Sequence, residues 1–233
     1  MLAGVKVIPF KSKNQAVNTI ISEQGDVLEG VAVAVNPEKV IKALEDQPTM
    51  RIINSSTIQY ADGIGVVKAL ERKTSQKLAR VAGCELWLDV LNRSIQFNLP
   101  VVLIGAQQHV VEACANILKE QGVNIVAFQN GFFEGVEDVL PLIEKVQPKI
   151  VIVAQGSPRQ EKLIDKIRDS YSSAFFMGVG GSFDVLAGEV PRAPKSWQKL
   201  NLEWLYRLAK EPKRIFRQKG LVKFVWLAVR GKL

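Results

Sequence analysis

Two aspartates in or near glycine-containing loops are the residues of this 233-residue chain whose types and spacing could support chemistry. Asp62 precedes Gly63 at the expected start of a helix, and Asp184 follows the glycine-rich run 178–182. A carboxylate in such a loop can take the proton of an attacking hydroxyl group. The same carboxylate can instead cap the first turn of a helix, and position alone favours the cap for Asp62. Both interpretations stay open for both residues at this point.

Five arginines have the chemistry to bind phosphate groups, because a guanidinium group can form two parallel hydrogen bonds to a phosphate. Arg80 precedes a glycine turn, and Arg192 stands on a stiff segment between two prolines. Arg207, Arg214 and Arg217 are spaced by seven and three residues, which would put them on one face of an unbroken helix. A proline between the first two interrupts that helix, and a solvated basic helix is the alternative to a binding surface.

The charge of the chain is concentrated near its C-terminus. Residues 192–233 hold 12 lysines and arginines and two acidic residues, whereas residues 1–191 hold 19 and 21. A strongly basic segment attracts anions, and the candidates are a nucleic acid, an anionic lipid surface and a diphosphate.

The elements that must position these residues follow from the alternation of apolar runs and helical patterns. Continuous Val/Ile runs are typical of strands buried on both faces, and short loops between strands and helices predict parallel pairing. We therefore expect an α/β fold, a Rossmann-like, mostly parallel sheet with helices on both faces, in residues 1–191, and a basic helical appendage in 192–233. Residues 1–30 predict a short hairpin or an edge. Strands are expected at 31–35, 51–54, 101–104, 123–128, 150–154 and 174–179, and helices at 36–45, 63–73, 83–98, 107–121, 137–146 and 158–171.

In such a sheet the ligand binds at the carboxyl ends of the strands. Asn36, Asp62, Gln160 and Asp184 all follow predicted strands, so we expect a polar cleft there. The sequence has no glycine fingerprint of a dinucleotide fold and no P-loop motif. It also has no paired aspartates of the DxD type, and its two cysteines lack metal-ligand spacing, so no metal and no cofactor is expected.

Six short runs, read together, resemble the WecG/TagA/CpsF glycosyltransferase family, and their wording most resembles its WecG branch. They occur in order between about residues 30 and 217. The runs are YADGIGVV at 60–67, RVAG at 80–83, GSPRQE at 156–161, GVGGSFD at 178–184, RAP at 192–194 and LEWLYRL at 202–208. The chain departs from the pattern at Ala34, where teichoic-acid members carry threonine, and at Cys84-Glu85, where Ser-Asp or Ala-Asp is more usual.

The resemblance implies an inverting, metal-independent transferase in which Asp62 is the catalytic base. It implies that N-acetylmannosaminuronic acid passes from a UDP-sugar donor to undecaprenyl-diphosphate-linked GlcNAc, in enterobacterial common antigen synthesis. By the same resemblance, Asn36 lies near the reacting sugar. The remaining residues expected to bind substrate are Arg80, Gln160, Asp184, Arg192, Arg207, Arg214 and Arg217.

The expected location is the cytoplasm, peripheral on the cytoplasmic face of the inner membrane, because no signal-peptide pattern and no apolar stretch of ~18 residues occurs. A related transferase that uses UDP-N-acetylmannosamine or another UDP-sugar is the first alternative. A sugar-nucleotide sensor is the second. Nucleic acid is not expected as a partner, because the aromatic residues of the basic segment have core spacing rather than the arrangement of a stacking platform. Assembly of the chain with itself stays open.

Overall fold

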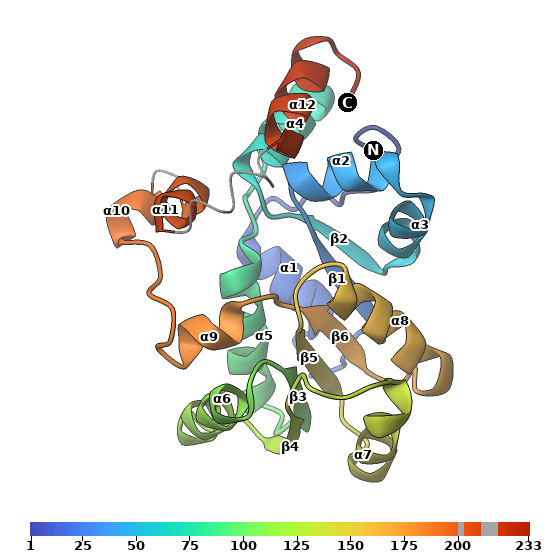
Figure 1. Cartoon of the computed structure of the whole chain (residues 1–233), viewed down its shortest axis with the longest axis vertical. Coiled ribbons are helices and arrows are strands. Elements are labelled where there is room, and N and C mark those ends of the chain that lie inside the picture. The colour runs from blue at the N-terminus through green and yellow to red at the C-terminus, as the bar shows by residue number, and fades with distance from the viewer. Residues whose placement is uncertain (200–202, 211–218) are drawn as a thin grey trace.

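A six-stranded, all-parallel sheet forms the centre of the molecule in the computed structural model, which describes residues 1–199, 203–210 and 219–233 (Figure 1). The strand order is β2-β1-β6-β5-β3-β4. Most strands are buried Val/Ile/Phe runs, as a sheet covered on both faces requires. The strands are β1 (Gly30–Val35), β2 (Ile58–Ala61), β3 (Val101–Gly105), β4 (Ile125–Gln129), β5 (Ile150–Ala154) and β6 (Phe175–Gly178).

Helices cover both faces of this sheet, and the apolar residues divide into two core clusters accordingly. Neighbouring residues of β1 point to opposite faces, so Val33 joins one cluster and Ala32 the other. The predicted α/β fold with helices on both faces is therefore confirmed. One layer contains α2 (Pro37–Glu45), α3 (Gln47–Ser55), α4 (Ile64–Thr74), α7 (Leu140–Val146) and α8 (Arg159–Ser170), with the short helix η1 (Val136–Asp138) beside α7. The other contains α1 (Lys13–Ile20), α5 (Gly83–Ile95), α6 (Gln108–Glu120) and α9 (Ser182–Leu186).

Two predictions about the first third of the chain are wrong. Residues 51–54, predicted as a strand, lie within α3, because Asp46 caps this helix and a proline stands in its first turn. The strand next to β1 is instead β2, which lies in a stretch predicted to be a loop. Its four residues include the buried Gln59, so they do not form the continuous apolar run that predicts a buried strand. Residues 1–30, predicted as a short hairpin or an edge, contain helix α1. They also form a parallel bridge from Ile8 to Tyr60 of the edge strand β2 and an antiparallel bridge between Ile21 and Val27, so the prediction is met in part.

The order of the strands places a crevice between β3 and β5. The chain leaves β3 toward β4 and leaves β5 toward β6, in opposite directions along the sheet. Loops that diverge in this way open a crevice at the carboxyl ends of the strands, where ligands of such sheets bind. The fold therefore directs the search for a site to the loops that follow β1, β2, β3, β5 and β6.

Where the structure describes it, the segment after residue 192 contains helices and no strand, as predicted: α10 (Lys195–Lys199), α11 (Glu203–Lys210) and α12 (Lys219–Val229). Helix α12 returns to the body and packs on α2 (Figure 1). Phe224 is 2% exposed and belongs to the core cluster, and Lys223 Nζ lies 2.5 Å from Glu45 Oε1. Part of this segment thus shares the core of the body, and its separation as a domain of residues 192–233 stays a prediction. Within the described residues no helix is long and apolar enough to cross a bilayer.

Candidate functional site

Two adjoining cavities lie at the carboxyl ends of the strands. The first, with a volume of about 560 Å³, is formed by the loops after β3, β4, β5 and β6, and we name it the β3–β5 cavity. The second, of about 610 Å³, is formed by the loops after β1, β2 and β6 together with α12, and we name it the β1–β2 cavity. Gly180 and Gly181 line both. One ligand with two parts could therefore occupy both cavities across this glycine turn.

Asp62 lies in the β1–β2 cavity and does not cap the helix that follows it. The N-cap of α4 is Gly63, without a side-chain cap bond. The Asp62 backbone N–H donates to the carbonyl of Val35 at 3.1 Å, which fixes the loop to the end of β1. Its Oδ1 accepts from the backbone N–H of Gly83, the first residue of α5, at 3.0 Å. This position leaves the carboxylate facing a cavity, so its role as a base stays a chemically sound prediction.

Asn36 and Lys39 connect the same cavity to the start of α2. Asn36 Oδ1 caps the helix by accepting from the backbone N–H of Lys39 at 2.8 Å, so the rigid N-terminus of α2 fixes its side chain. The ammonium group of Lys39 lies 2.7 Å from Glu161 Oε1, and both side chains are largely buried. This pair joins α2 to α8 below the cavity.

Gln160 extends this network to the glycine turn. Its Nε2 donates to Glu161 Oε1 at 3.3 Å, and its Oε1 accepts from the backbone N–H of Gly180 at 2.9 Å. Gly178 has no side chain that could block this contact: a Cβ there would lie 2.4 Å from Gln160 Nε2. Gln160 therefore lines the β1–β2 cavity and fixes the turn that the two cavities share, and substrate binding by it stays a prediction.

Arg80 and Arg192 form one ion-pair network around Glu203. Arg80 Nη2 lies 3.1 Å from one Glu203 carboxylate oxygen, and Arg192 Nε lies 3.3 Å from the other. Arg192 Nη2 also reaches Glu85 Oε1 at 2.6 Å. Burial alone would raise the pKa of Glu85, but hydrogen bonds from Arg192 and Lys13 outweigh it and hold this pKa below its ordinary value. The network ties α11 to α5.

Glu203 was missed as a site residue by the sequence reasoning, as was Lys39. The sequence did contain a signal for Glu203: residues 192–233 hold 12 basic residues and only two acidic ones, and Glu203 is one of the two. Arg80 lines the β1–β2 cavity, and substrate binding by it stays a prediction. Arg192 serves here as the link between Glu203 and Glu85, and substrate binding by it stays a prediction.

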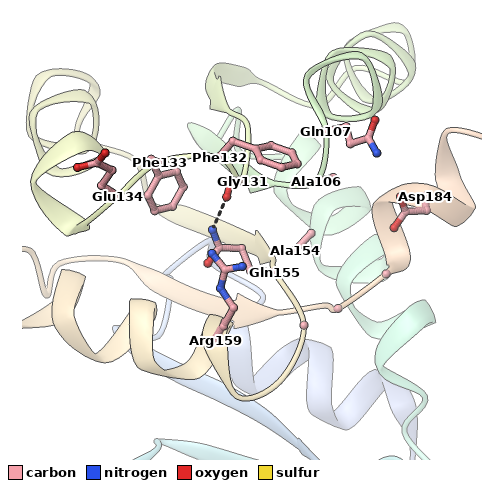
Figure 2. Close-up of a pocket in the computed structure, with 13 residues that line it drawn as sticks. Ala106, Gln107, Gly131, Phe132, Phe133, Glu134, Ala154, Gln155, Arg159 and Asp184 are labelled. Atoms are coloured by element: carbon pink, nitrogen blue, oxygen red, sulfur yellow. Dashed lines mark hydrogen bonds between the residues drawn. The ribbon is translucent and has the colours of Figure 1, made fainter. Parts of the chain in front are cut away.

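The β3–β5 cavity combines aromatic rings with opposite charges (Figure 2). Phe132, with 76% of its surface exposed, and Phe133 lie on the loop after β4. Arg159 points into the cavity from the first turn of α8, and it takes part in none of the ion pairs found among the described residues. Asp184 lies across the cavity on α9. Gln155 fixes the aromatic loop by donating from Nε2 to the carbonyl of Gly131 at 3.2 Å.

Three of the predicted arginines give no geometry here. Arg214 and Arg217 lie outside the described residues, and of Arg207 only its place in α11 is described. Their contact with a diphosphate therefore stays a prediction. Among the described residues, no group of three or more side chains could hold a metal ion.

A comparison with protein-family models gives a match over almost the whole chain. The family described as "Glycosyl transferase WecG/TagA/CpsF family" matches residues 2–233. The match thus includes both cavities, the strands below them and the C-terminal helices.

Proposed function

Because the chain belongs to the WecG/TagA/CpsF glycosyltransferase family and is a transferase with a sugar-nucleotide donor and an acceptor, we propose the specific reaction it catalyses. N-acetylmannosaminuronic acid passes from its UDP donor to undecaprenyl-diphosphate-linked GlcNAc, as in enterobacterial common antigen synthesis. The observation that carries this proposal is the pair of cavities sharing one glycine turn, with a carboxylate in one and aromatic rings with an arginine in the other.

We propose one orientation of the donor in this arrangement. Its nucleoside and diphosphate suit the β3–β5 cavity, where exposed phenyl rings can stack on a base and Arg159 with the N-terminus of α8 can bind phosphate. Its sugar then crosses the turn at Gly180 and Gly181 into the β1–β2 cavity, beside Asp62. This orientation brings the anomeric carbon beside Asp62, as a base that acts on the acceptor hydroxyl group requires.

The reaction in this orientation is a single displacement. Asp62 takes the proton of the acceptor 4-hydroxyl group as its oxygen forms the new bond to the anomeric carbon. The bond from that carbon to the UDP oxygen breaks, and the configuration inverts. Negative charge grows on the departing diphosphate, and arginine side chains with the first turn of α8 stabilise it. We expect no need for an added divalent cation, which transfer in the presence of EDTA would test.

The acceptor and the membrane belong to the same proposal, with the cytoplasmic face of the inner membrane as the place of reaction. Leu221 and Val225 of α12 line the β1–β2 cavity, and Val225 is also 52% exposed. The cavity that would hold the acceptor sugar therefore borders an apolar helix face. A polyprenyl chain stays in the bilayer, so its diphosphate-linked sugar must be reached from a surface of this kind.

A transfer assay tests the reaction. Purified protein, a polyprenyl-diphosphate-linked GlcNAc acceptor and either UDP-N-acetylmannosaminuronic acid or UDP-N-acetylmannosamine are combined, and the lipid product is identified by mass. We expect product with the uronic acid donor. Product with UDP-N-acetylmannosamine alone would favour a teichoic-acid, capsule or exopolysaccharide transferase. Binding of a donor without any product would favour a sugar-nucleotide sensor.

A further inference from the structure

The hydroxyl group of Tyr60 is a buried polar group without a partner. Tyr60 is 0% exposed, and its Oη makes no hydrogen bond in the described structure. A buried hydroxyl group without a hydrogen bond costs about 1–3 kcal/mol, and phenylalanine would fill the same space without that cost. Tyr171 shows the usual solution, since its hydroxyl group donates to the carbonyl of Pro148 at 2.9 Å. An unmet hydroxyl group therefore requires an explanation.

The position of this hydroxyl group connects it to the candidate base. Tyr60 lines the β1–β2 cavity, and a Cβ added at Gly83 would lie 2.8 Å from its Oη. The hydroxyl group thus lies against the backbone of Gly83. The same glycine donates its N–H to Asp62 at 3.0 Å. Tyr60 and Asp62 therefore flank one backbone turn at the wall of one cavity.

The hydroxyl group is fit to donate a hydrogen bond and unfit to act as a base. Burial, followed by the nearby negative charge of Asp62, raises the pKa of Tyr60 well above its ordinary value. It therefore keeps its proton at every pH at which the protein would work. A protonated phenol needs an acceptor oxygen, and sugars offer hydroxyl and amide oxygens.

We propose that the Tyr60 hydroxyl group donates a hydrogen bond to a hydroxyl or amide oxygen of the transferred sugar, and so selects the sugar part of the donor. This assignment rests on the proposed function. A side chain at position 83 would crowd the hydroxyl group, since its Cβ would lie 2.8 Å from Tyr60 Oη, and glycine leaves that space empty. The contact would be made to the sugar and not to the nucleotide, because Tyr60 does not line the β3–β5 cavity.

Tyr60→Phe tests this with three measurements on the full-length chain. Calorimetry gives the affinities for UDP, UDP-N-acetylmannosamine and UDP-N-acetylmannosaminuronic acid. We expect affinity for the sugar that is transferred to fall by roughly 3–10-fold, the worth of one hydrogen bond, and affinity for UDP to stay unchanged. The melting temperature should stay the same or rise, because an unmet polar group is removed.

Tyr171→Phe is the matched control. It removes a hydroxyl group that is hydrogen-bonded far from the cavities, so its melting temperature should fall while every affinity stays unchanged. Equal sugar-donor affinity in Tyr60→Phe and wild type would overturn the inference alone, and so would a marked fall in melting temperature, since the hydroxyl group would then serve the fold. If the wild-type protein binds no UDP-sugar, the proposed function fails and the inference fails with it.

Discussion

Asp62 shows how a single side chain can be fixed without losing its chemistry. One carboxylate oxygen is occupied by the Gly83 N–H, and this bond orients the group toward the cavity. Asp62→Asn keeps an oxygen that can accept the same bond, so the fold and the affinity for UDP should be retained. The variant lacks the proposed base, so turnover should fall by ~10²–10⁴-fold, as measured by initial rates of lipid-linked product formation.

Asp169→Asn is a suitable control for this change, because Asp169 lies on the exposed last turn of α8 and lines neither cavity. It should turn over at the wild-type rate. Near-normal turnover by Asp62→Asn would leave Asp62 with the purely structural role of holding the start of α5.

Cys84 provides a second test at the residue scale. Cys84 is half-buried, lines the β1–β2 cavity and has its Sγ 3.6 Å from Arg192 Nη2. Cys114 is fully buried, and burial raises its pKa to about 12, so its thiolate is scarce. N-ethylmaleimide should therefore modify Cys84 first and abolish most turnover, because the adduct fills the cavity. Peptide mass analysis identifies the modified residue.

The Cys84→Ser variant distinguishes inactivation through modification of Cys84 from inactivation through modification of another residue. The variant should keep its activity in the presence of the reagent, whereas Cys114→Ser should be inactivated like the wild type. Inactivation of Cys84→Ser at the wild-type rate would show that the cavity is not where the reagent acts.

At the scale of elements, apolar patterning predicted most of the sheet, because strands such as β3 and β5 are uninterrupted Val/Ile runs between polar loops. It also placed Asp62, Asn36 and Gln160 near one another, because the carboxyl ends of parallel strands share an edge. It failed at β2, where four buried residues include a glutamine and a tyrosine.

Patterning could not reveal the ion pairs that support the site. Lys39 and Glu161 are 122 positions apart, and Arg80 and Glu203 are 123 apart. Such contacts depend on how α2, α8 and α11 pack against the body, and no local spacing encodes that packing. The residues expected to bind substrate could thus be proposed from motifs, whereas the side chains that hold them in place became visible only in the fold.

The stabilisation that the Glu85–Arg192 ion pair contributes to the link between α5 and α11 should depend on pH. The pKa of Glu85 is lower in the folded protein than in the unfolded chain. Its contribution to the free energy of unfolding is therefore present above about pH 4.3, and is lost as the pH falls through the lower folded-state pKa. Glu85→Gln should reduce the free energy of unfolding at pH 7 by less than about 1 kcal/mol, because the pair is partly exposed.

Urea denaturation at pH 7 and at about pH 3 measures this difference. Wild type and Glu85→Gln should differ at pH 7 and converge at the lower pH. Glu144→Gln, an exposed residue of α7 away from this link, should track the wild type at both. A difference between Glu85→Gln and wild type that stays constant with pH would contradict the ion-pair explanation.

At the scale of the whole molecule, α12 contributes residues to the core, to the wall of the β1–β2 cavity and to an exposed apolar surface. Phe224 faces the core, and Leu221 with Val225 faces the β1–β2 cavity. The outer face carries Val222, Trp226 and Val229, which are 73%, 47% and 75% exposed. Positions spaced by four and three residues form one stripe along a helix. An exposed apolar stripe on a basic segment fits a helix that lies in a membrane surface.

Flotation on anionic liposomes tests this placement with the full-length chain. The triple variant Val222→Ser, Trp226→Ser and Val229→Ser removes the apolar stripe and keeps every basic residue. It should float poorly compared with wild type, and the residual binding should disappear at high salt, because only screened electrostatic attraction remains. The face of α12 that packs on the body and lines the β1–β2 cavity is unchanged in this variant. Transfer to a water-soluble, short-chain acceptor should therefore persist.

The control removes two exposed valines that lie outside α12. Val126 on β4 and Val190 after α9 are 38% and 42% exposed, and β4 lies far from α12 (Figure 1). Val126→Ser with Val190→Ser should float like the wild type, because neither valine belongs to the α12 stripe. Equal flotation of the triple variant and the wild type would assign membrane contact to another surface. The stripe would then be an unexplained apolar face beside the cavity.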